Sequence, residues 1–190
     1  MTRLRAAIAL LTILFSPLLR AEPATYRIDP EHFSIAFLIE HVGYARMIGQ
    51  FTRASGEFVY DEERKQLQSG SVDVEAASVS THHEQRDAHV RNADFLDAEK
   101  YPVIRFVAKQ YRVDGILTGD LTMLGQTHPV ELKVTLNKAA SYPFGHRKHT
   151  LGISATATIQ RSRWGMTYGV ANGMVGDAVE LLLELEAVRE

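Results

Sequence analysis

The sequence predicts an all-β fold with one or two short helices, and three observations support this prediction. About eight closely spaced segments alternate between apolar and polar residues, as strands with one buried face do. Short turn signals separate them, and Gly125–Gln126 is typical of a tight antiparallel hairpin. Only the stretch 81–96 has the composition and capping signals of a helix. From the residues alone, these strands fit either a closed barrel or a sandwich.

Residues 1–21 have the layout of a secretory signal peptide. Arg3 and Arg5 precede an apolar run over residues 6–15, and Ala21 offers a small residue at which the segment could be cleaved. An uncleaved membrane anchor is the alternative, but the apolar run is short for a bilayer span. We therefore expect export to the periplasm and a single mature domain over residues 22–190.

The composition excludes several classes of function. The 190 residues are 45% hydrophobic, which is enough for a core, and the formal net charge is −2. Removing the first 21 residues removes three arginines and no acidic residue, which takes the net charge to −5. An acidic chain of this kind is a poor candidate for binding nucleic acid or an anionic membrane surface. The absence of cysteine excludes disulfides, a thiol nucleophile and thiolate metal ligands.

The first three predicted strands are 33–41, 49–61 and 71–79. In the first, every second residue from Phe33 to Ile39 is apolar, and His41 continues the same face. A histidine in this position is more often a hydrogen-bonded core group, and contact with a ligand headgroup is the alternative.

The charged stretch that follows predicts a helix in a chain otherwise made of strands. Thr81 with Glu84 three residues later is a capping-box signature, so we start the helix at Thr81 and end it near Asn92. Arg86 and Asp87 are expected to fix this helix at one end of the strands, and Arg86 facing an anionic headgroup is the alternative.

Five further strands are predicted after the helix: 103–113, 116–124, 130–138, 151–160 and 178–188. A loop over 141–149 separates the third and fourth of them. Trp164, the only tryptophan, follows the fourth strand, and either core packing or the wall of a tunnel mouth would explain it.

Several blocks of this sequence together resemble the YceI-like family of exported isoprenoid-binding proteins. They are YRIDPEHFSIAF (26–37), HVGYARMIGQF (41–51), HEQRDAHVRNADFLDAEKYPVIRF (83–106), LTGDLTMLGQTHPVEL (117–132), ISATATIQRSRWGM (153–166) and VELLLELEAV (179–188). The resemblance implies an extended, eight-stranded, lipocalin-like antiparallel β-barrel with an apolar tunnel. It also implies a long isoprenoid ligand, such as a polyprenyl phosphate or an isoprenoid quinone, and a possible homodimer.

With this resemblance, the apolar stripes of the strands become candidate tunnel wall. The candidate wall residues are Phe33, Ile35, Phe37, Ile39, Phe51, Phe58, Phe106, Leu121, Met123, Trp164 and Met166. The candidate headgroup or rim residues are His41, Arg86, His89 and Arg91.

The alternative to a carrier is a barrel enzyme that uses histidines and carboxylates on a lipid-like substrate. No serine elbow or phosphate loop is present, and His89 follows His83–Glu84 two positions too late for the H-E-x-x-H zinc motif. We therefore predict no catalytic residue, metal or cofactor. An outer-membrane barrel is disfavoured because charges interrupt both faces of the strands, so no stable membrane insertion is expected.

Overall fold

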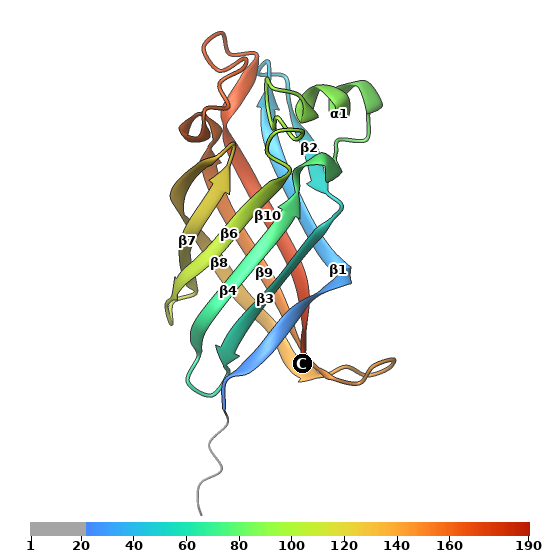
Figure 1. Ribbon diagram of the computed structural model, residues 1–190, viewed down its shortest axis with the longest axis vertical. Helices are drawn as coiled ribbons and strands as arrows, with labels where there is room; N and C mark the ends of the chain where they lie inside the picture. The colour runs from blue at the N-terminus through green and yellow to red at the C-terminus, as the bar shows by residue number, and fades with distance from the viewer. Residues whose placement is uncertain (1–21) are drawn as a thin grey trace, which may run out of the picture.

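The computed structural model describes residues 22–190, which form a closed antiparallel barrel of eight strands with one α-helix (Figure 1). The order around the barrel is β1, β3, β4, β6, β7, β8, β9 and β10, and β10 pairs back onto β1. The ranges are β1 Ala24–His41, β3 Ala54–Asp61, β4 Gln66–Glu75, β6 Val103–Tyr111, β7 Ile116–Met123, β8 Gln126–Ser141, β9 His149–Gln160 and β10 Val175–Arg189. The eight-stranded barrel is therefore confirmed, whereas the predicted signal peptide lies outside the described residues.

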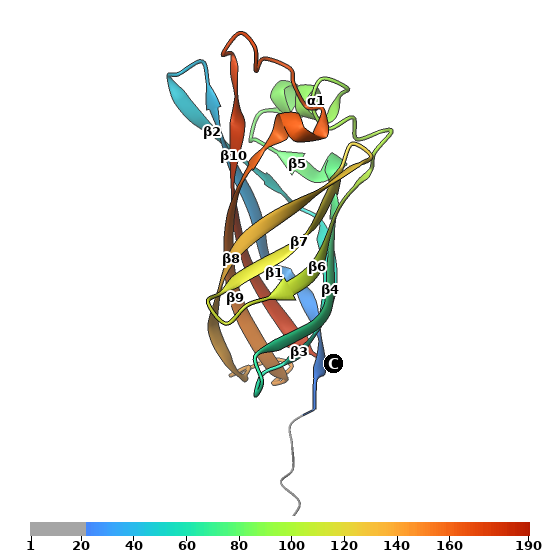
Figure 2. The same ribbon diagram turned by 90° about the vertical axis from the view of Figure 1, so that its left-hand side faces the viewer.

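Two short strands, β2 (Ala45–Phe51) and β5 (Val79–Ser80), extend the sheet at the end where the helix lies (Figure 2). The start of β1 pairs with β3, and its last seven residues pair with β2. The predicted strand 49–61 is thus two strands, because the chain leaves β pairing at Thr52–Arg53.

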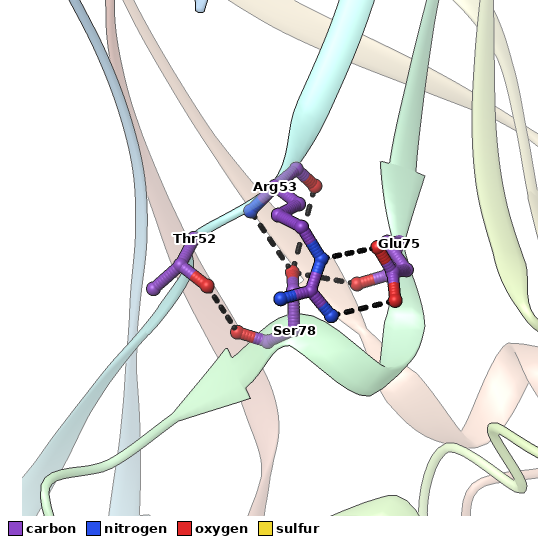
Figure 3. A network of polar contacts seen from close by, with 4 residues as sticks. All are labelled: Thr52, Arg53, Glu75 and Ser78. Carbon is purple, nitrogen blue, oxygen red and sulfur yellow. Dashed lines mark hydrogen bonds and ion pairs between the residues drawn. The ribbon is translucent and has the colours of Figure 1, made fainter. Parts of the chain in front are cut away.

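A polar network holds this break between β2 and β3 (Figure 3). The Thr52 hydroxyl donates to the Ser78 carbonyl at 3.1 Å, and the backbone N–H of Arg53 donates to Ser78 Oγ at 3.1 Å. The Arg53 guanidinium also forms a two-pronged ion pair with Glu75, with one contact at 2.6 Å. Ser78 belongs to the 3₁₀ turn η1 (Ala76–Ser78), so the network fixes the point where β4 gives way to β5.

The helix α1 spans Glu84–Arg91, and the prediction that Thr81 caps it is wrong. His83 is the N-cap, and its Nδ1 accepts a hydrogen bond from the backbone N–H of Arg86. Thr81 is instead buried and donates to Asp87. The C-cap is Asn92, close to the predicted end. Among the described residues, no helix is both long and apolar enough to cross a bilayer.

The two ends of the barrel differ in their connections. At the α1 end lie the β1–β2 turn, the α1 segment, the β7–β8 turn and the β9–β10 connection, which includes the 3₁₀ turn η2 (Arg161–Trp164) (Figures 1 and 2). At the far end, the last residues of β10 pair with the start of β1. The β7–β8 hairpin is confirmed, although its turn is Leu124–Gly125, because Met123 pairs directly with Gln126.

Candidate ligand cavity

An apolar cavity of about 700 Å³ runs inside the barrel. Its size lies within the range of about 300–1,000 Å³ that is typical of small-molecule pockets. Alternating residues of three neighbouring strands line one side, because successive side chains of a strand point to opposite faces. These residues are Val130, Leu132, Val134 and Leu136 on β8, Leu151, Ile153, Ala155 and Ile159 on β9, and Val179, Leu181, Leu183 and Leu185 on β10.

The cavity is elongated. On β10 its wall extends from Val175 to Leu185. At about 3.4 Å per residue and a strand tilt of about 40°, this stretch corresponds to roughly 26 Å along the barrel axis. The shape therefore suits a long, narrow, apolar molecule better than a compact one.

The structure places nine of the eleven predicted wall residues on the cavity surface: Ile35, Phe37, Ile39, Phe51, Phe58, Phe106, Leu121, Met123 and Met166. It does not bring Phe33 or Trp164 there. Phe33 follows a register shift in β1 and packs against the main core cluster. Trp164 is fully buried and donates from Nε1 to the Leu121 carbonyl at 3.0 Å. Of the two interpretations of Trp164, the structure supports core packing.

Three of the four predicted headgroup residues, His41, Arg86 and His89, line the cavity. The fourth, Arg91, does not. Arg91 reaches the Val79 carbonyl at 3.4 Å. Arg86 donates through Nε to Thr81 Oγ1 at 2.8 Å and through Nη2 to the Thr81 carbonyl at 2.7 Å. Arg86 therefore fixes α1 to the segment before it, while part of its side chain faces the cavity.

Asp87 also attaches α1 to Thr81, because its carboxylate accepts hydrogen bonds from the backbone N–H and the hydroxyl of Thr81. Its Oδ1 lies 2.6 Å from the Thr81 N and 2.5 Å from the Thr81 hydroxyl. Burial alone would raise the pKa of Asp87. The two hydrogen bonds and the positive charges of Arg91 and Arg86 outweigh burial, so the pKa is lowered.

Three aromatic rings gather at the α1 end of the cavity, and all three line it. The His89 ring centroid lies 5.1 Å from those of Phe95 and Tyr168, and the Phe95 and Tyr168 centroids lie 5.2 Å apart. Sequence reasoning proposed only His89 of the three. Phe95 and Tyr168 lie in non-strand segments, where no alternation indicates which way a side chain points.

Arg161, which the sequence suggested only as an arginine beside Trp164 that could face an anionic headgroup, organises the β9–β10 connection. It is 1% exposed and donates to four carbonyl oxygens, those of Met166, Tyr168, Val175 and Gly176, at 2.7–3.0 Å. Burial lowers the pKa of its guanidinium, and Asp177 opposes this effect. Because it holds both arms of the connection, Arg161 positions Tyr168 beside the cavity.

A second packed cluster occupies the far end of the barrel. Tyr26 is fully buried, stacks on Phe58 with ring centroids 5.4 Å apart, and donates from its hydroxyl to Glu62. Burial, followed by the contact with Glu62, raises the pKa of Tyr26. Tyr60 belongs to this cluster, Tyr111 packs against it, and both line the cavity. The polar side chains His41, His83, Gln85, Arg86 and His89 thus gather at the α1 end, and the aromatic side chains of Phe58, Tyr60 and Tyr111 line the far end.

One group of potential metal ligands occurs among the described residues, and it lies outside the cavity wall. It comprises Asp29, His32 and Glu186. His32 Nδ1 lies 2.9 Å from an Asp29 oxygen and 3.9 Å from a Glu186 oxygen. These contacts are those of an ion-paired group on the outer face.

Fold and cavity together define a class: a closed antiparallel β-barrel with an elongated apolar interior. The chain belongs to the YceI-like family, because the model of the YceI-like domain matches residues 26–187.

Sequence and structural relatives agree with this assignment. A UPF0312 protein of Pseudomonas putida (strain GB-1) is 35% identical over 191 residues, covering 97% of this chain and 96% of the relative. The solved YceI protein of Campylobacter jejuni superposes with a TM-score of 0.71 at 26% identity, covering 80% of this chain and 89% of that one. A polyisoprenoid binding domain from Saccharophagus degradans has the same fold, with a TM-score of 0.65, 11% identity and coverage of 89% and 100%.

Proposed function

We propose that this protein is an exported binding or carrier protein for a long-chain isoprenoid lipid, such as a polyprenyl phosphate or an isoprenoid quinone. The observation that supports this proposal most directly is the elongated cavity, whose wall is mainly apolar along the strands and carries most of its histidine and charged side chains near α1. The fold shared with a polyisoprenoid binding domain is consistent with it.

The energetics favour recognition of the chain over recognition of the headgroup. An isoprenoid unit has five carbons, and at about 0.8 kcal/mol per buried CH₂-sized group it contributes about 4 kcal/mol. Association costs on the order of 4–15 kcal/mol, so burial of several units gives net binding. Affinity should therefore rise with chain length and depend weakly on the headgroup. Such a protein would let a water-insoluble chain exist in the periplasm.

Native mass spectrometry of protein purified without detergent from its natural compartment tests the proposal. A bound species of isoprenoid mass, identified after organic extraction, is the expected result. An empty protein that also takes up neither added isoprenoid quinone nor added polyprenyl phosphate would refute it. The same spectra give the mass of the mature chain, which tests cleavage after Ala21. Turnover of the added lipid would instead favour the histidine-dependent enzyme.

A matched pair of variants tests whether the chain occupies the barrel interior. Ala155 is buried and lines the cavity on β9, and the neighbouring Thr156 is exposed on the other face. Ala155→Phe should displace about one isoprenoid unit, which costs about 3–4 kcal/mol and lowers affinity for long chains by more than about a hundredfold. Thr156→Phe should leave uptake unchanged. Equal uptake by both variants would contradict binding inside the barrel.

A further inference from the structure

The connections at the two ends of the barrel differ in charge. At the far end, the β3–β4, β6–β7 and β8–β9 connections (62–65, 112–115 and 142–148) all contain charged residues. At the α1 end, the β1–β2 and β7–β8 turns and the segment 165–174 contain none. The charged residues in the other connections at this end lie in the α1 segment, in η2 (Arg161 and Arg163) and at Arg53.

Two of these uncharged segments form one exposed apolar surface, the mouth patch, made of Val42, Tyr44, Tyr168 and Met174. Their exposed fractions are 45%, 91%, 39% and 43%. The backbone N–H of Val42 donates to the Met174 carbonyl at 3.1 Å, so the two segments are held side by side. Exposed apolar groups that cluster in this way mark an interaction surface.

The mouth patch is continuous with the cavity. Tyr168 and Met174 belong to the cavity wall as well as to the surface. A molecule that entered at the patch would therefore meet apolar side chains from the surface to the interior.

Val42 adds a conformational observation. Its φ is +52°, a region that β-branched residues rarely adopt and that asparagine or glycine tolerates better. The side chain is nearly half exposed, so burial in the core does not explain why a valine stands there. An apolar side chain at a strained, exposed turn is consistent with a role outside the protein's own packing.

We propose that the mouth patch docks on the surface of a lipid bilayer, and this inference rests on the proposed lipid-carrier function. A bilayer fits better than a protein partner for two reasons. An isoprenoid chain resides in a bilayer, and contact at the patch would let it enter the cavity without crossing water. Tyrosine and uncharged apolar side chains suit the interfacial region of a bilayer, where the tyrosine hydroxyl stays hydrated. Because the patch carries no charge, docking should not need anionic lipid.

Flotation with phosphatidylcholine vesicles tests the docking. Wild-type protein should float with the vesicles, and Val42→Asn/Tyr44→Ser should weaken this association by about tenfold or more. Neither residue lines the cavity, so equilibrium uptake of an isoprenoid quinone from a vesicle-free stock should be unchanged. The asparagine also suits the positive φ, so the melting temperature should be kept or raised. The matched control is Val113→Ser/Phe144→Ser, which removes apolar groups that are 90% and 65% exposed at the far end.

Four results would overturn the docking proposal: no flotation of the wild type, equal flotation of the patch variant, equal weakening by the control variant, or association only with vesicles that contain anionic phosphatidylglycerol. Wild-type protein that takes up quinone but does not float would overturn the docking and leave the carrier function intact. Wild-type protein that takes up neither the quinone nor a polyprenyl phosphate would refute the carrier function itself.

Discussion

Replacing Arg161 with alanine should destabilise the protein by about 3–5 kcal/mol. The guanidinium donates four hydrogen bonds to carbonyl oxygens, and a bond that involves a charged group contributes about 1.5–3 kcal/mol. The full sum is not lost, because water can reach part of the β9–β10 connection once the side chain is gone. Arg161→Lys keeps the charge but not the planar arrangement of donors, so it should cost about half as much.

Thermal unfolding followed by circular dichroism measures this effect. For a chain of this size, 1 kcal/mol corresponds to about 2–4 °C, so Arg161→Ala should lower Tm by about 10 °C. Arg163 is the matched control, because it is exposed and its guanidinium carbon lies 5.5 Å from the Trp164 ring centroid. Arg163→Ala should cost no more than about 1 kcal/mol. Equal losses for the two variants would refute the reasoning that Arg161 holds the connection in place.

Two further predictions concern the side chains that fix the α1 end. Asp87→Asn should cost about 1–2 kcal/mol near neutral pH, because charge-assisted bonds from Thr81 become neutral ones. Since the folded-state pKa of Asp87 is lowered, its contribution is complete above the unfolded pKa and disappears as pH falls through the folded pKa. Urea titrations from pH 7 to pH 2 should show the gap between variant and wild type closing in acid, and a constant gap would contradict this. Trp164→Phe should cost about 1–3 kcal/mol by leaving the Leu121 carbonyl without its donor, with lipid uptake unchanged. Lost uptake at unchanged stability would instead place Trp164 on the ligand wall.

Alternation along the strands predicted most of the barrel. The stripe from Ile35 through Ile39 to His41 lies on the cavity wall because the period of a strand is fixed at two by backbone geometry. Once one residue is known to face inward, the alternation predicts which other residues of the strand face inward. The local pattern predicts one continuous strand over 49–61, whereas the structure breaks it at the network around Ser78. That network joins residues about 25 positions apart, so a local pattern does not contain it.

The helix shows where local patterns fail. Thr81 and Glu84 have capping-box spacing, yet Thr81 is buried against Asp87 and His83 is the cap. Both arrangements satisfy the helix N-terminus, and the difference depends on whether Thr81 faces solvent or the barrel. A window of a few residues contains no information about that choice.

The sequence by itself determined an all-β class of about eight strands, the apolar faces of those strands and the presence of one charged helix, because strand period and local composition are properties of neighbouring residues. Only the tertiary structure decided that Arg161 is buried among carbonyls, that Phe95 and Tyr168 meet His89, and that Val42 and Met174 form one surface. These contacts join segments far apart in the chain, and closure of the barrel brings them together.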